Sequence, residues 1–176
     1  MNYLKDSEKV AEAEDLALRA HDGQFRNDGT TPYFVHPRAT VDRLKKWGVT
    51  DVDGLSAMWL HDTVEDHRAQ FSDIKHFGPR VFELVEVLTF TGAGREEKQC
   101  WMDNFGDSED KLLLYLKASD RLCNVDDYFA AGEASYAIKY LHKARRLFAK
   151  LRKFAESGDA IASKIIAEYD TIEGSI

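Results

Sequence analysis

The chain contains few of the residues that interrupt helices or cross-link small domains. Only 3 of its 176 residues are proline, and 2 are cysteine, Cys100 and Cys123. Two isolated cysteines exclude a disulfide framework and a zinc ribbon. The scarcity of proline permits long helices.

Positive charge is also in short supply, with a formal net charge of −7. A protein that binds duplex nucleic acid usually has a basic face, and no such block of Lys and Arg occurs here. No apolar run approaches the length of a membrane span, and the first residues, MNYLKDSEKVAEAED, lack the apolar segment of a secretory signal. We therefore expect a cytoplasmic protein that binds neither nucleic acid nor membranes.

What the chain does contain is helical periodicity in ordinary globular composition, with 44% hydrophobic and 31% charged residues. The pattern predicts helices at 6–21, 37–47, 51 or 53 to 66, 71–77, 79–88, from 108 onward, 134–157 and 159–169. The polar, glycine-bearing stretch 89–107 is expected to be a loop or a broken helix. No segment alternates convincingly with period two, so we predict an all-α fold that forms a single domain over residues 1–176.

An apolar helix in the segment AMWLHDTVEDHR abruptly acquires charge. His61 lies one turn before Glu65, and Asp62 lies one turn before Asp66, so the two pairs form adjoining stripes on one face. Three carboxylates this close repel one another, and the C-terminal end of a helix dipole would add to the repulsion. A solvated helix end explains Glu65 and Asp66 but not His61 and Asp62, which directly follow Met58-Trp-Leu. A divalent cation is the simplest compensating ligand.

A carboxylate in another predicted helix, Asp120, lies on the apolar stripe of that helix in KLLLYLKASDRLCNV. Such a carboxylate needs a cation or strong hydrogen-bond donors. A metal ion and a structural ion pair, for example with Arg121 or a distant arginine, are equally compatible with the pattern. Asn124, four residues later, shares the face of Asp120.

His36, between Pro-Tyr-Phe-Val and Pro37, is ambiguous alone, because a histidine at a helix start is more often a cap or a packed side chain. Combined with His61, Asp62 and Asp120 it completes a set of two imidazoles and two carboxylates, which suits Mn, Fe, Co or Zn better than Mg. Such a metal would lower the pKa of a water molecule and withdraw charge from a phosphoryl oxygen. Glu65 or Asp66 could orient or deprotonate that water.

The order His36, His61-Asp62, Asp120 resembles the H…HD…D signature of HD-domain phosphohydrolases. The blocks AHDGQFRNDGTTPYFVHP, LHDTVED, FG-x-x-V and KASDRLCNV are similar to the hydrolase domain of RelA/SpoT-type enzymes, which degrade the alarmone (p)ppGpp of the stringent response. The resemblance covers roughly residues 17–140 and includes no synthetase domain, as in small alarmone hydrolases.

This resemblance implies a role for individual residues. Its implied metal ligands, usually for Mn²⁺, are His36, His61, Asp62 and Asp120, and its implied catalytic pair is Glu65 and Asp66. Its implied contacts to a guanine nucleotide substrate are Arg26 against the base, Asn124 at the ribose and Tyr140 near the phosphates. The reaction would release pyrophosphate from the ribose 3′ position.

The sequence departs from the family pattern along the expected pocket wall. Asn27 replaces a usual lysine, Cys123 replaces a histidine, and Asp126-Asp127-Tyr128 replaces Arg-Thr-Leu. A nucleotidase or phosphatase for another nucleotide, such as NADPH, therefore stays open. A non-catalytic nucleotide sensor is a further alternative, which the retention of Glu65 and Asp66 disfavours. Arg95 and Lys98 are as compatible with a solvated loop as with substrate phosphates.

Overall fold

The computed structural model describes residues 3–26 and 28–174 and bears out the all-α prediction. Within these residues no strand is present, and the single β-bridge joins Phe25 and Pro32. No helix in the described part of the chain is long and apolar enough to cross a membrane. The chain divides into two compact units, residues 1–45 with 49–91 and residues 46–48 with 92–176. The expected single domain over residues 1–176 stays a prediction.

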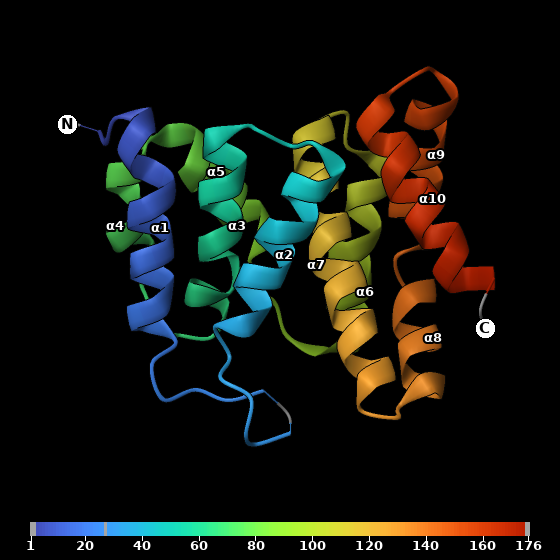
Figure 1. Cartoon of the computed structure of the whole chain (residues 1–176), viewed down its shortest axis with the longest axis horizontal. Coiled ribbons are helices and arrows are strands. Elements are labelled where there is room, and N and C mark those ends of the chain that lie inside the picture. Colours follow the sequence, from blue (N-terminus) through green and yellow to red (C-terminus); the bar gives the residue numbers. More distant parts are fainter. Residues whose placement is uncertain (1–2, 27, 175–176) are drawn as a thin grey trace. The chain divides into compact units, whose positions relative to one another are not determined.

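The first unit is built around a helix that is buried on nearly all sides. Its elements are α1 (Asp6–Ala20), α2 (Val35–Trp47, of which residues 35–45 belong here), α3 (Val52–Glu65), α4 (Phe71–Ile74), the 3₁₀ turn η1 (Lys75–Phe77) and α5 (Pro79–Leu88). Helix α3 packs against α1 and α5 (Figure 1). Its residues 54–61 are all buried, because the helix is apolar around its circumference. The His-Asp pair therefore emerges from the core of the unit.

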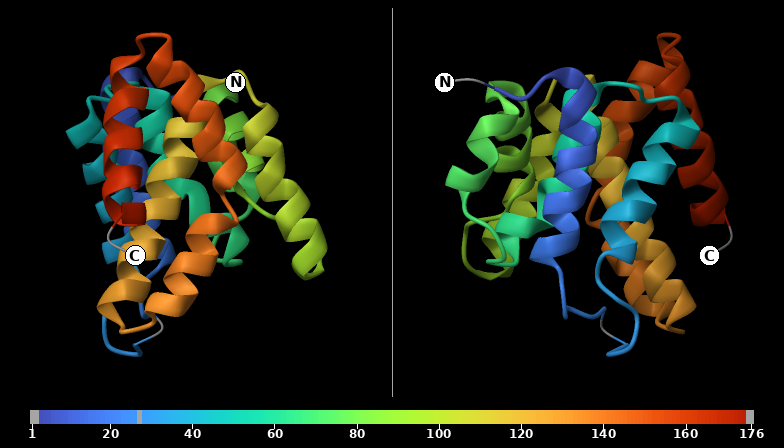
Figure 2. Two further views of the ribbon diagram at one scale, coloured as in Figure 1. Left: turned by 90° about the vertical axis from the view of Figure 1, so that its right-hand side faces the viewer. Right: turned by 60° about the vertical axis from the view of Figure 1, so that its left-hand side comes forward.

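The second unit is centred on the longest helix of the described chain. Its elements are α6 (Gly94–Asn104), the 3₁₀ turn η2 (Phe105–Asp107), α7 (Lys111–Ala130), α8 (Ala134–His142), α9 (Arg145–Glu156) and α10 (Ala160–Gly174). Helix α7 packs against α8, and α10 packs against α9 (Figure 2). A Cβ on Gly106 would lie 2.6 Å from the Cβ of Arg146, so glycine is required where η2 meets α9.

Two predicted elements differ from the structure. The stretch 89–107 contains an ordered helix, α6, whose polar sequence buries little more than Met102 and therefore lacks a strong apolar stripe. The helix predicted over 134–157 is two helices, α8 and α9, separated at Lys143 and Ala144. The other predicted helices are present, with ends displaced by a few residues.

Candidate functional site

The end of α3 places four polar side chains of the first unit close together. The helix starts with Asp51, whose carboxylate accepts a hydrogen bond from the Gly54 amide at 2.8 Å. It ends at Glu65 with a Schellman motif, in which the amides of His67 and Arg68 donate to the carbonyls of Val64 and Thr63.

Among the described residues other than glycine, His67 alone has a positive φ, 56°. The left-handed conformation is the one that a Schellman motif requires at this position, and it is strained for a residue with a side chain. The turn leaves Glu65 as the last helical residue and Asp66 as the cap, at the negative end of the helix dipole.

Three of the four predicted metal ligands converge in the first unit. Donor atoms of His36, His61 and Asp62 all lie within 4.8 Å of one another. Nε2 of His61 lies 3.1 Å from one carboxylate oxygen of Asp62, and Nε2 of His36 lies 3.5 Å from the other. Both histidines are buried, and the Asp62 side chain is 16% exposed.

The orientation of His61 is suited to binding a cation. Its Nδ1 lies 2.7 Å from the carbonyl oxygen of Met58, which can only accept, so Nδ1 carries the proton. In the neutral ring Nε2 then presents its lone pair toward Asp62. A histidine ligand held by a backbone carbonyl through its other nitrogen is the usual arrangement in metal sites. The trio therefore fits a divalent cation by donor type, burial and tautomer.

Tyr33 is a member of this site that sequence reasoning did not single out. Its hydroxyl donates to Asp62 at 2.8 Å, and its ring packs against His21 with centroids 4.7 Å apart and planes tilted by 30°. Burial, together with the charges of Asp62 and Asp66, raises the pKa of Tyr33 far above its ordinary value, so the hydroxyl stays protonated. Its place in the PYFVHP block, three residues before His36, was the available signal.

The predicted catalytic pair is half-buried and hydrogen-bonded, so it does not form a solvated helix end. One carboxylate oxygen of Glu65 accepts from the backbone amide of Phe90 at 3.2 Å. One carboxylate oxygen of Asp66 accepts from the side-chain amide of Gln24 at 2.7 Å. Both carboxylates belong to the same unit as the trio.

Asp120, the fourth predicted ligand, belongs to the second unit, and its role as a ligand stays a prediction. It is 6% exposed, and both of its oxygens are bonded within α7. Lys117 donates to Oδ2 at 2.9 Å, and Asn124 donates to Oδ1 at 2.7 Å. Lys117, one turn earlier on the same face, is an ion-pair partner that the sequence analysis did not name, while the suggested partner, Arg121 or a distant arginine, stays a prediction.

The three predicted substrate contacts lie in different surroundings. The guanidinium of Arg26 lies 5.2 Å from the centre of the Tyr33 ring in the first unit. Asn124 is bonded to Asp120, and Tyr140 lines a pocket of the second unit. Asn27, the first departure from the family pattern, lies outside the described residues.

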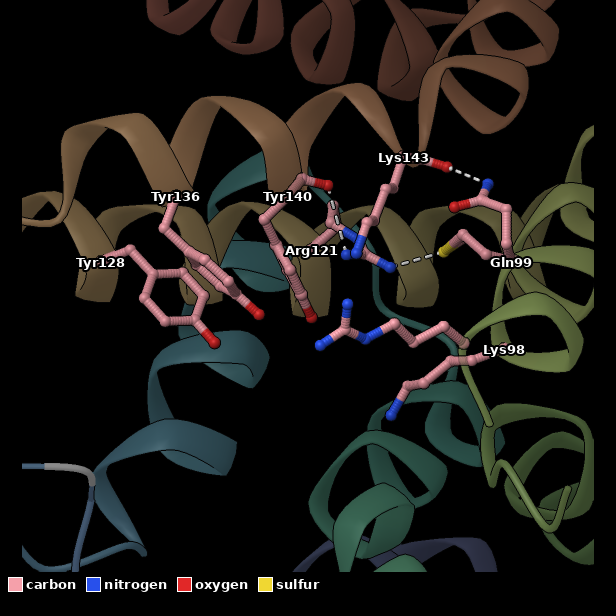
Figure 3. Close-up of a pocket in the computed structure, with 9 residues that line it drawn as sticks. Lys98, Gln99, Arg121, Tyr128, Tyr136, Tyr140 and Lys143 are labelled. Atoms are coloured by element: carbon pink, nitrogen blue, oxygen red, sulfur yellow. Dashed lines mark hydrogen bonds between the residues drawn. The ribbon is translucent and has the colours of Figure 1, made fainter. Parts of the chain in front are cut away.

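The pocket of the second unit has a volume of about 340 Å³ and combines positive charge with aromatic rings (Figure 3). Its lining consists of Arg95, Lys98, Gln99, Met102, Arg121, Tyr128, Tyr136, Tyr140 and Lys143. Four of these side chains are cationic, and no carboxylate is among them. Such a pocket is suited to a multiply charged anion.

Arg121 is the most deeply placed of these cations. It is 4% exposed, and its guanidinium lies 3.8 Å from the centre of the Tyr140 ring. It also donates to the carbonyl of Tyr140 and to the sulfur of Met102. Neither Arg121 nor Lys143 was predicted to bind substrate: Arg121, within KASDRLCNV, was considered only as a partner of Asp120, and Lys143 lies in no motif. Tyr128, one of the departures from the family pattern, forms part of the wall.

Comparison with known proteins places the chain among HD-domain proteins. A family model described as HD domain matches residues 13–154. The chain is 36% identical over 127 residues to guanosine-3′,5′-bis(diphosphate) 3′-pyrophosphohydrolase MESH1 of Xenopus tropicalis, covering 69% of this chain and 70% of that protein. It is 34% identical over 130 residues to the guanosine-3′,5′-bis(diphosphate) 3′-pyrophosphohydrolase of Aquifex aeolicus (strain VF5), covering 70% of this chain but only 18% of that one.

The chain also resembles a solved structure over its whole length. It comes from work titled "A metazoan ortholog of SpoT hydrolyzes ppGpp and plays a role in starvation responses", and its TM-score is 0.78 at 26% identity, with 100% of both chains covered. The match of the family model extends over well more than half of the chain. The protein therefore belongs to the HD-domain family.

Proposed function

We propose that this chain is a (p)ppGpp 3′-pyrophosphohydrolase. The observation that carries the proposal is the trio of buried His36, buried His61 and partly exposed Asp62 beside Glu65 and Asp66, in a chain 34–36% identical to proteins named for this reaction. The reaction consumes one water molecule, which adds to the phosphorus next to the ribose. The 3′ oxygen leaves with a proton, so ppGpp yields GDP and pyrophosphate.

The metal would be held by His36, His61 and Asp62, with Asp120 as the proposed fourth ligand. The metal that we propose is Mn²⁺, which the family resemblance implies; two imidazoles with carboxylates suit Mn, Fe, Co or Zn better than Mg²⁺. When bound, a divalent cation supplies an acidified water molecule and electrostatic stabilisation of the phosphoryl group. Tyr33 and the carbonyl of Met58 support this role by holding Asp62 and His61 in place.

Glu65 and Asp66 would orient the attacking water and accept its proton. Support comes from their position at the end of α3, directly after the HD pair, and from the donors that hold them. Each oxygen of an ionised carboxylate has two lone pairs, so an oxygen that accepts a hydrogen bond from the protein can also accept one from a water molecule. Proton transfer by a positioned carboxylate contributes about 10²- to 10⁴-fold to such reactions.

The guanine nucleotide would contact Arg26 through its base, Asn124 through its ribose and Tyr140 through its phosphates. The cationic pocket around Tyr140 supports the last assignment, because Lys98, Arg121 and Lys143 add charge that a nucleoside polyphosphate would neutralise. A guanidinium presents paired donors that match phosphate oxygens.

The test is incubation of metal-stripped protein with ppGpp, with and without Mn²⁺, followed by anion-exchange separation of the products. The expected result is GDP and pyrophosphate in equal amounts, formed only when metal is added. Turnover of NADPH but not ppGpp would instead assign a phosphatase acting on another nucleotide. Nucleotide binding without any turnover would assign a sensor.

A further inference from the structure

The loop between α1 and α2 connects His21 to the proposed catalytic carboxylate through one glutamine. Nδ1 of His21 lies 2.7 Å from Oε1 of Gln24, and Nε2 of Gln24 lies 2.7 Å from Oδ2 of Asp66. His21 is 3% exposed, while Gln24 and Asp66 are half-buried. The three side chains lie in the first unit and form a continuous chain of hydrogen bonds, here named the relay, which runs from the core to the end of α3.

The direction of each hydrogen bond in this chain follows from chemistry. An ionised carboxylate only accepts, so Gln24 must present its NH₂ group to Asp66 and its carbonyl oxygen to His21. His21 must therefore donate from Nδ1, since two acceptors 2.7 Å apart would repel. Burial lowers the pKa of His21, which favours the neutral ring with this one proton.

The backbone around Gln24 is held firmly enough to fix the side chain. The Gln24 amide donates to the carbonyl of His21 at 3.0 Å, and the Gln24 carbonyl accepts from the amide of Tyr33 at 2.9 Å. The bridge between Phe25 and Pro32 closes the loop, and the Tyr33 ring packs on His21. The glutamine therefore starts from a defined backbone position, and His21 holds its far end.

We propose that His21 and Gln24 are positioning residues that set the rotation of the Asp66 carboxylate, which rests on the proposed role of Asp66 in handling the water. Asp66 caps α3 beyond its last turn, so the helix restricts its backbone but not its side chain. The helix dipole and the charge of Asp62 both repel a second carboxylate here. A fixed amide donor offsets that repulsion and leaves Oδ1 available to the water.

The first experiment replaces the amide while keeping its length. Gln24→Met is expected to lower kcat about 10- to 100-fold, as loss of outer hydrogen-bond partners typically does. KM for ppGpp and the affinity for Mn²⁺, measured by calorimetry on metal-stripped protein, should stay within about 2-fold. Gln70→Met makes the same chemical change at an exposed position and is expected to leave kcat unchanged. An unchanged kcat in Gln24→Met, or a parallel loss of Mn²⁺ affinity, would overturn the proposal.

The histidine is tested by removing its donor and then restoring it. His21→Leu should lower kcat to a similar extent as Gln24→Met. His21→Asn places an amide NH₂ near the position of Nδ1 and should recover most of the lost rate. Equal rates in the two His21 variants would show that the histidine only fills space, and would contradict the relay.

A double-mutant cycle separates failure of this inference from failure of the proposed function. Asp66→Asn alone should lose most of the rate, and adding Gln24→Met to it should cost nothing further, because the amide acts only through Asp66. Full additivity of the two changes would refute the relay while keeping Asp66 in the mechanism. Wild-type turnover in Asp66→Asn would remove Asp66 from the mechanism and the relay with it.

Discussion

The buried ion pair of Lys117 and Asp120 allows a quantitative test of how much a charged contact contributes to the stability of the protein. Their side chains are 5% and 8% exposed, and the ammonium lies 2.9 Å from the carboxylate oxygen and 4.2 Å from the centre of the Trp101 ring. Lys117→Met keeps the aliphatic stem but removes the ammonium next to the buried Asp120, to which Asn124 still donates. Removing one partner of a buried pair costs about 3–5 kcal/mol, and the remaining donor favours the lower end, about 3 kcal/mol.

The assay is urea unfolding followed by circular dichroism in the presence of a chelator, so that no metal compensates the charge. In thermal unfolding of the same variant, about 3 kcal/mol corresponds to a lowering of Tm by roughly 6–12 °C for a chain of this length. The matched control is Lys150→Met, because its partner Glu109 is 78% exposed. A pair of that kind contributes at most about 1 kcal/mol.

The decisive variant combines Lys117→Met with Asp120→Asn. Asparagine removes the uncompensated charge, so the double variant should be more stable than Lys117→Met alone. A loss below about 1 kcal/mol in Lys117→Met, or no recovery in the double variant, would refute the assignment of this pair as a buried ionic interaction.

Four further results are expected. Asp62→Ala should abolish Mn²⁺ binding and turnover together, and calorimetry with an activity assay would detect any retention of either. His67→Gly should raise the free energy of unfolding by about 0.5–1 kcal/mol, because glycine relieves the left-handed strain at a modest entropic cost; a less stable variant in urea would contradict this. Arg121→Met should raise KM for ppGpp about 10-fold or more, since a charge-assisted hydrogen bond contributes about 1.5–3 kcal/mol; an unchanged KM in initial-rate kinetics would exclude Arg121 from phosphate binding. Burial raises the pKa of Asp159, but hydrogen bonds from the Ala162 amide, Lys111 and Tyr115 outweigh it and lower the pKa to about 2. Because this folded pKa is below the unfolded value of 3.8, Asp159→Asn should destabilise the protein above pH 4, and the difference from wild type should disappear as pH falls toward 2. Unfolding curves across that pH range would test this; a difference that persists at pH 2 would contradict it.

The failures of sequence reasoning have identifiable physical causes. The stretch that contains α6 was expected to be a loop or a broken helix, because a helix that buries little has no apolar stripe to detect. Lys117 was not named as a partner of Asp120, because the search considered arginines and overlooked the lysine one turn away on the same face. The division of 134–157 into α8 and α9 has no proline or glycine to mark it.

The residue pattern was enough to predict the all-α fold and its most informative local feature, an apolar helix that ends in His61, Asp62, Glu65 and Asp66. Both depend on periodicity and on the cost of burying charge, which neighbouring residues set. Folding brings in the distant groups, His36 and Tyr33 at Asp62 and Gln24 at Asp66, and it separately gathers four cations around the pocket of the second unit. Contacts between residues far apart in the chain depend on which helices pack together, and periodicity shows which face of a helix is buried but not which partner covers it.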